Sequence, residues 1–216
     1  MASQPTHQAN PGSLAKDLIT LVQQDGSASH GWAQALLTGA PRDLSDAAHQ
    51  FAALHARHPG VIDLAGNVAL LAPLADRIAT AFAAERAYLA ALVVAVGPVP
   101  GTPGQAQSEA ALVAQRHALE TLAQSDRTGC ACGTVTALLL DWAAIRPVLD
   151  AAARHFGLTP PPSDLPDPTT LTTTIDAVEV PPLAGRAAQF GARQLLLQHN
   201  GLWDLLEARA HARGSA

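Results

Sequence analysis

The stretch LADRIATAFAAERAYLAALVVAV, residues 74–96, decides the fold because its apolar side chains recur at the spacing of an α-helix. One stripe along this helix contains Leu74, Ile78, Phe82, Leu89, Leu92 and Val96. Glu85 lies inside the stripe, three residues after Phe82 and four before Leu89, so its carboxylate is expected to face the core. A carboxylate in an apolar interior is protonated, paired with a cation or bound to a metal. We therefore predict a partner for Glu85, and Arg146 is one candidate.

The composition favours helices over strands. Of the 216 residues, 48% are hydrophobic but only 4% are aromatic, and much of the apolar content is alanine, a strong helix former. A chain of this length fills one domain. We predict an all-α fold, a single bundle of about five to seven helices over residues 13–216. A disordered tail is expected over residues 1–12, and a proline-rich linker over residues 159–168.

Hydrophobic periodicity and capping signals place the helices along the chain. We predict helices over residues 14–24, 32–37, 43–58, 74–96, 105–124, 134–155 and 183–212, and an interrupted helical stretch over residues 61–71. Pro147 predicts a kink or a restart in its helix. Residues 129–133, which include Cys130 and Cys132, are expected to form a tight turn. Residues 169–180 match neither a helix nor a strand clearly.

The charge balance and the hydropathy argue against several classes of partner. Thirteen Lys and Arg stand against 18 Asp and Glu, a formal net charge of −5, and no basic run is present, so nucleic acid is not expected as a partner. The longest apolar segment, near Leu89 to Val96, is shorter than the roughly 18–20 residues that cross a bilayer. The N-terminus has neither the basic start nor the apolar core of a signal peptide. We expect a cytoplasmic protein without membrane contact.

Common catalytic and nucleotide-binding motifs are absent from the sequence. GxGxxG, GxxxxGK[ST], HExxH and GxSxG do not occur, which removes the usual support for nucleotide-binding loops, zincins and the hydrolase elbow. Cys130 and Cys132 are close neighbours and poor candidates for a structural disulfide. A C-x-C without a second pair is also a weak metal signal.

Four ionisable side chains fall on the inward faces of three predicted helices. They are His55, His58, Glu85 and His199. Three imidazoles and a carboxylate suit Zn²⁺, Fe²⁺ or a similar divalent ion, and helical bundles build such sites from facing helices. Gln115 or Asp141 would then serve as a further ligand or orient an imidazole. The alternative is that each histidine is a neutral core residue bonded to a carbonyl, and that Glu85 is structural.

Four segments carry a resemblance to known proteins. They are ERAYLAAL at 85–92, TPGQ at 102–105, QRHAL at 115–119 and LDWAAIRPVLD at 140–150. Through them the chain resembles an uncharacterised family of bacterial all-helical proteins, a domain of unknown function, which implies a bacterial and cytoplasmic origin but no particular activity. Over residues 43–156 it also resembles ferritin-like bundles in outline. Those di-iron proteins carry Glu-x-x-His motifs, whereas the nearest match here, Asp46-x-x-His49, is predicted to point away from His55 and His58.

Two functional hypotheses follow, and they belong to different classes. The first is a helical binding or scaffold module whose inward polar residues are structural, with homo-oligomerisation left open. The second is a metal-binding bundle that uses Glu85 with His55, His58 and His199, and that is an iron- or zinc-dependent enzyme if an open coordination position faces a pocket. The sequence does not decide whether the protein is an enzyme.

Overall fold

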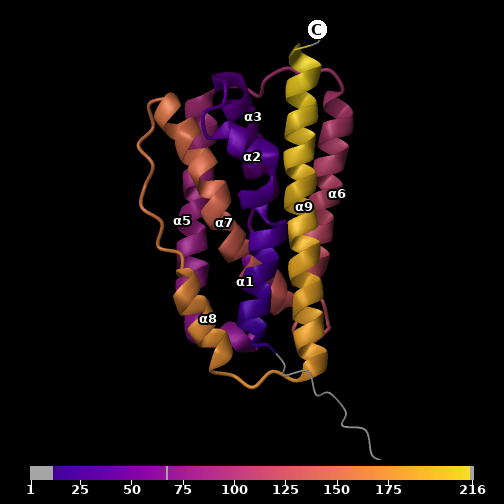
Figure 1. The fold of residues 1–216 in the computed structure, drawn as a ribbon. Coiled ribbons are helices and arrows are strands. Elements are labelled where there is room, and N and C mark those ends of the chain that lie inside the picture. Colours follow the sequence, from indigo (N-terminus) through magenta and orange to yellow (C-terminus); the bar gives the residue numbers. More distant parts are fainter. Residues whose placement is uncertain (1–11, 67, 215–216) are drawn as a thin grey trace, which may run out of the picture.

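A computed structural model describes residues 12–66 and 68–214, and all regular elements in this part of the chain are helical (Figure 1). In chain order they are α1 (Leu14–Asp25), the 3-10 turn η1 (Ser27–Ser29), α2 (Gly31–Leu36), α3 (Pro41–His55), α4 (Val61–Ala65), the 3-10 turn η2 (Ala69–Leu74), α5 (Ala75–Val96), α6 (Gln105–Ala123), α7 (Cys130–His155), α8 (Pro168–Asp176) and α9 (Pro182–Gly214). The predicted all-α bundle is confirmed. Nine α-helices lie in these ranges, where about five to seven were expected, because α2, α4 and α8 are short pieces of five to nine residues.

Two parts of the prediction fall on residues outside the described ranges. The disordered tail expected over residues 1–12 lies outside them except for Gly12. The interruption expected near Gly66-Asn67 separates α4 from η2, and residue 67 itself is outside the described part of the chain.

The helix with the most extensive burial is α7, and α5 packs against one side of it. Large side chains of α7 such as Trp142 and Ile145 are at most 1% exposed. On α5 the predicted stripe is buried from Ile78 to Val96, but the opposite side of this helix is open, and Val94 is 82% exposed. The stripe at residues 74–96 therefore exists as predicted, although it belongs to a helix at the edge of the bundle.

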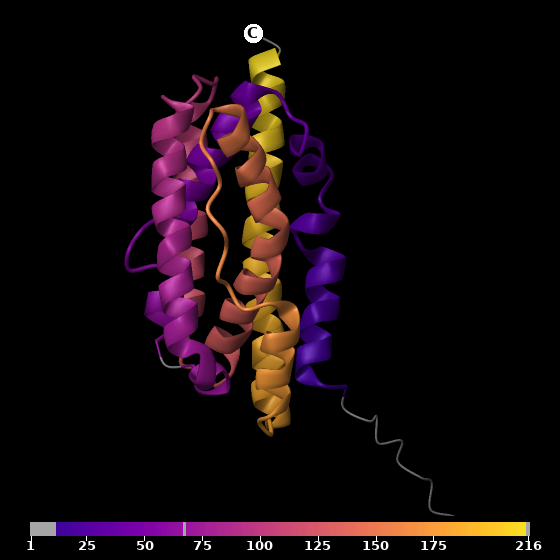
Figure 2. The ribbon, with the colours of Figure 1, turned by 90° about the vertical axis from the view of Figure 1, so that its left-hand side faces the viewer.

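The longest helices, α7 and α9, run parallel with their backbones in close contact (Figures 1 and 2). A Cβ atom at Gly133 would lie 1.8 Å from the carbonyl oxygen of Ala188, and one at Gly129 would lie 2.2 Å from that of Ala184. Only glycine permits this approach. The turn predicted over residues 129–133 is therefore wrong: α7 begins at Cys130, and Gly133 serves helix packing.

The parallel course of α7 and α9 requires a long return connection, because α7 ends at the opposite end of the bundle from the start of α9. Residues 158–167, here called the strap, provide the first part of it, and they correspond to the predicted proline-rich linker. Figure 2 shows the strap descending along the bundle to α8. A proline-rich segment suits this task because it is extended and makes no regular hydrogen bonds of its own.

The threonine-rich residues 169–180, which the sequence left unassigned, contain most of α8, which begins at Pro168. The Asp167 carboxylate caps this helix by accepting a hydrogen bond of 2.9 Å from the backbone N–H of Thr170. Leu171 and Ile175, four residues apart, are both 1% exposed. Capping and the burial of one apolar face outweigh the modest helix propensity of threonine.

α3 is shorter at its C-terminal end than predicted. It ends at His55 instead of His58, because the chain turns before Pro59-Gly60 and a residue that precedes proline avoids the helical conformation. Residues 56–58 therefore do not continue the helical face on which His58 was predicted.

Pro147 does not end α7, which continues from Cys130 to His155.

Two helical stretches of the described residues are long and apolar enough to cross a membrane by length and composition. They are Ala69–Val96 and Cys130–His155, with 39% and 78% of their most apolar windows buried in the protein. The sequence prediction that no stretch reaches this length was wrong, because alanine-rich helices keep a high mean hydropathy despite a few charges. Core helices pass the same test, so this finding assigns no location.

Candidate functional site

Three buried carboxylates organise the polar interior of the bundle. They are Glu85 on α5, Asp141 on α7 and Asp46 on α3, and none is more than 2% exposed. Each lies among donors that come from elements distant in the sequence. Their partners determine what the interior can do, because a buried carboxylate without partners is costly.

Glu85 is paired with a permanent cation. Its two carboxylate oxygens lie 2.6 and 2.7 Å from Nη1 of Arg146. The indole N–H of Trp142 donates at 3.1 Å, and the Ser163 hydroxyl of the strap donates at 2.7 Å. Glu85 thus faces the core as the sequence predicts, and of the alternatives for its partner the structure contains the ion pair with Arg146.

Arg146 connects this pair to the strap. Its Nη2 donates to the backbone carbonyl of Pro161, and its Nε lies 2.7 Å from Oδ1 of Asp150. The guanidinium lies over the ring of Tyr88, 4.2 Å from the centroid, and the Tyr88 hydroxyl donates to Asp150 at 2.8 Å. Burial opposes the charge of Arg146, but Asp150 and Glu85 raise its pKa. Glu85, Arg146 and their partners together form what we call the Glu85 clamp.

Asp141 is paired with a titratable partner instead. Nδ1 of His199 lies 2.6 Å from Oδ2 of Asp141, and Nε2 of His199 lies 3.0 Å from Nε2 of His55. His199 and His55 are 0% and 3% exposed. Because the two Nε2 atoms face each other, one of them carries the hydrogen that they share. Burial and the nearby His199 lower the pKa of His55 well below its ordinary value of 6.5.

The other side of Asp141 holds the turn between α1 and α2. The backbone N–H and the hydroxyl of Ser27 each donate to Asp141 at 2.6 Å. The indole N–H of Trp203 donates to the same Ser27 hydroxyl at 2.8 Å. Ser27, Asp141, His199 and His55 form a chain of buried polar groups, which we call the histidine relay.

Aromatic rings join the relay to the Glu85 clamp. The ring of Trp142 meets that of His55 edge-on, with centroids 5.4 Å apart, while its N–H donates to Glu85. Phe51 stacks on His55 at 6.5 Å, and Phe82 meets it edge-on at the same distance. The buried imidazole of His55 therefore has three aromatic neighbours in addition to His199.

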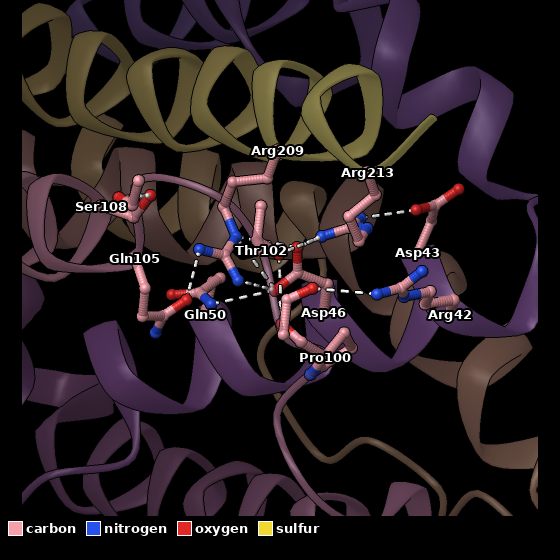
Figure 3. Close-up of polar contacts among 12 residues, drawn as sticks. Arg42, Asp43, Asp46, Gln50, Pro100, Thr102, Gln105, Ser108, Arg209 and Arg213 are labelled. Atoms are coloured by element: carbon pink, nitrogen blue, oxygen red, sulfur yellow. Dashed lines mark hydrogen bonds and ion pairs between the residues drawn. The ribbon is translucent and has the colours of Figure 1, made fainter. Parts of the chain in front are cut away.

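The third carboxylate, Asp46, lies in a cluster that the sequence reasoning did not identify (Figure 3). Both oxygens of Asp46 accept hydrogen bonds from Arg209, and Arg213 and Gln50 add further bonds. Burial opposes ionisation of Asp46, yet its hydrogen bonds to Arg209, Arg213 and Gln50 hold its pKa below the ordinary 3.8.

This cluster fixes the connection between α5 and α6. Arg209 donates to the side chain of Gln105 at 2.9 Å, and Arg213 to the hydroxyl of Thr102 at 3.0 Å. Arg42 donates to the carbonyl of Gly101 at 2.9 Å (Figure 3). One sequence signal could have revealed it: Arg209 and Arg213 continue the apolar stripe of Leu202 and Leu206 at intervals of three and four residues.

The four residues predicted as metal ligands do not form one group. His55 and His199 meet, and Glu85 reaches them only through Trp142. His58 lies apart, with 72% of its side chain exposed and its Nδ1 3.2 Å from Asp63. Within the described ranges, no three His, Cys, Asp or Glu side chains are grouped so that they could hold a metal ion.

The other residues considered in the sequence analysis either bond to other parts of the fold or are buried. They are Gln115, Asp141, Cys130 and Cys132. The side-chain amide of Gln115 donates to the carbonyl of Gln198 at 3.2 Å and joins α6 to α9. Asp141 orients His199, which is the supporting role predicted as one alternative. Cys130 and Cys132 are buried and free, and burial raises the pKa of Cys132 to about 11, so this thiol stays protonated at neutral pH.

One cavity adjoins the Glu85 clamp. It has a volume of about 260 Å³ and lies between α7 and the strap, with Trp142, Arg146, Ser163 and Leu165 in its wall. Glu85, His55 and His199 do not line this cavity. All three nitrogens of the Arg146 guanidinium are already bonded, and of the two acids of the clamp Asp150 lines the cavity while Glu85 does not.

Comparison with known proteins gives one match. Residues 22–214 match the model of a family described as a family of unknown function (DUF6975). No curated protein and no solved structure matches the chain.

Proposed function

We propose that this chain, which belongs to the family of unknown function DUF6975, is a helical binding or scaffold module whose buried ionic residues maintain its shape. One observation carries the proposal: each buried acid holds a non-helical connection in place. Glu85 and its partner Arg146 hold the strap, Asp141 holds the turn at Ser27, and Asp46 with its arginines holds the loop between α5 and α6.

The satisfaction of these carboxylates supports a structural role. Asp46 and Glu85 each accept hydrogen bonds from guanidinium and neutral donors, and every oxygen of these two carboxylates has at least two donors. A rigid bundle with fixed connections is what a binding surface requires, because preorganised surfaces lose less entropy on association.

A metal-binding bundle is the second candidate, and one observation favours it. The Nε2 atoms of His55 and His199 point at each other across 3.0 Å, and Asp141 bonds the far nitrogen of His199. A histidine that binds a metal with one ring nitrogen commonly donates a hydrogen bond from the other to a carboxylate. Two imidazoles are fewer than the three protein ligands of catalytic zinc sites, so this candidate needs ligands beyond the pair.

Elemental analysis of the untagged protein, purified without chelator, separates the two candidates. The scaffold proposal predicts that the wild type carries no stoichiometric iron, zinc or manganese, and that Glu85→Gln remains folded and monodisperse. His55→Ala tests the alternative, with His117→Ala, an exposed histidine on α6, as the matched control. Near-stoichiometric metal that is lost in His55→Ala and kept in His117→Ala would overturn the scaffold proposal.

A further inference from the structure

An apolar stripe on the outer face of α9 is left uncovered. Leu183, Phe190 and Leu197 follow each other at intervals of seven residues and are 74%, 44% and 58% exposed. Seven residues are close to two turns, so these side chains lie in line along the helix. Large exposed apolar side chains gathered in this way mark interaction sites more often than single ones do.

Unpaired cations accompany the stripe. Arg186 and Arg193 lie on the same exposed face, between the apolar residues. Arg127, in the turn before α7, lies with its Cζ 5.8 Å from the ring centroid of Phe190. No ion pair among the described residues includes any of these three arginines, in contrast to Arg146, Arg209 and Arg213 in the interior.

A groove of about 490 Å³ joins one half of this stripe to the turn before α7. Its wall contains Leu183 and Phe190 from α9, Arg186 between them, and Arg127 with Thr128 from the turn. It lies at the end of the bundle where α7 and α9 both begin (Figure 1). Aligned helices carry partial positive charge at their N-terminal ends, which adds to the charge of the arginines.

We propose that this groove binds a soluble amphipathic organic anion, a carboxylate, sulfonate or phosphate attached to an apolar ring or chain. The volume falls within the range of small-molecule sites, which are mostly apolar with a few placed polar groups. Leu183 and Phe190 would contact the apolar part, and Arg127, Arg186 and the Thr128 hydroxyl would bind the anionic group. This site is remote from the histidine relay and does not depend on the proposed scaffold role.

Other occupants fit the observed charges or dimensions less well. In a second copy packed by its own stripe, antiparallel about Phe190, Arg186 would face Arg193 of the other copy, and like charges repel. An acidic helix from another protein would cover the whole stripe, including Arg193 and Leu197, which lie beyond the groove. A small anion needs only the groove itself.

The first probe is 8-anilinonaphthalene-1-sulfonate, which has one sulfonate on an aromatic body. Fluorescence titration of the full chain should show saturable binding, and Arg127→Gln or Arg186→Gln should weaken it about threefold to fivefold, the upper end of the range for an exposed charged contact. Added salt should weaken wild-type binding further. N-phenyl-1-naphthylamine, which lacks the sulfonate, should respond to Phe190→Ala but not to the arginine variants.

Arg193→Gln and Leu197→Ser are the matched controls, since both residues lie on the same exposed face of α9 but outside the groove. They should bind the sulfonate within about twofold of wild type, and circular dichroism should show all variants equally folded, as expected for exposed positions. Three results would overturn the proposal. The wild type shows no saturable binding of the sulfonate, or the two controls lose as much affinity as Arg127→Gln and Arg186→Gln, or neither of these two arginine variants changes the affinity. Binding only to anionic vesicles of phosphatidylglycerol, and not to the soluble anion, would overturn it as well.

Discussion

The Glu85 clamp and the histidine relay solve the same problem with different chemistry. Both bury a carboxylate from a long helix and use it to hold a distant piece of chain. The clamp pairs Glu85 with Arg146, whose raised pKa keeps it charged throughout the ordinary pH range. The relay pairs Asp141 with His199, and through it with His55, whose pKa is lowered. The Glu85 clamp is thus held by a permanent charge, whereas the stability of the histidine relay depends on the protonation of His55.

Removing the permanent cation should have the largest effect. Arg146→Ala leaves Glu85 buried without its counter-ion and releases the strap carbonyl of Pro161, so we expect a loss of about 3–5 kcal/mol in the free energy of unfolding. Urea denaturation followed by circular dichroism measures it. Glu85→Gln with Arg146→Met removes both charges, and it should recover most of the loss. Equal destabilisation in the single and double variants would show that packing, and not the stranded charge, controls the clamp.

Removing the acid of the relay should have a somewhat smaller effect. Asp141→Ala leaves the Ser27 N–H and the His199 ring N–H without their acceptor, for an expected cost of about 2–4 kcal/mol. Ser27→Ala removes a neutral hydroxyl and leaves the indole N–H of Trp203 without its acceptor, so it should cost less, about 1–2 kcal/mol in the same denaturation series. If Asp141→Ala is as stable as wild type, the relay contributes nothing to the fold.

Acid should weaken the relay and spare the clamp. The pKa of His55 is lower in the folded chain than the ordinary 6.5 that it regains on unfolding, so below about pH 6.5 only the unfolded chain takes up this proton. The stabilisation is complete above that pH and is lost as the pH falls, by up to about 1.4 kcal/mol per pH unit. As the pH is lowered from 8 to 5, the free energy of unfolding should fall more steeply for wild type than for His55→Gln; parallel curves would contradict this assignment.

The smallest effect is expected at His58, which belongs to neither region. Its side chain is largely exposed and lies beside Asp63, which also binds Arg86. His58→Ala should change the free energy of unfolding by less than about 0.5 kcal/mol. A differential scanning fluorimetry shift comparable to that of Asp141→Ala would place His58 in the buried network after all.

The ionisable residues that were predicted to face the core illustrate how far sequence reasoning reaches. Periodicity correctly directed Glu85 to the core, because side chains three and four residues apart share a helix face. It also selected His55 and His199. It wrongly placed His58 on the inward face as well, because α3 ends at His55 and the spacing of apolar residues does not show where a helix ends.

Contacts between helices were harder to predict. Asp46 and Arg209 lie 163 positions apart in the chain, and a periodic pattern in either helix gives a direction without naming the helix that it faces. The same limit concealed the contact of Gly133 with Ala188, which led to a predicted turn where α7 continues. Local rules therefore located most elements and both histidines of the relay, and offered Asp141 as one alternative, while the pairing of elements required the structure.

Parallel neighbours such as α7 and α9 cannot form by closing a short hairpin. The chain must first leave α7, descend along the strap and pass through α8 before the 33 residues of α9 can dock. Contacts of such long sequence separation form slowly, because loop-closure entropy is lost before they are made. During synthesis the face of α7 that α9 covers would stay open until α9 itself has been made. Chains that stop before α9 are therefore expected to aggregate or to be degraded, even though most of the bundle is present.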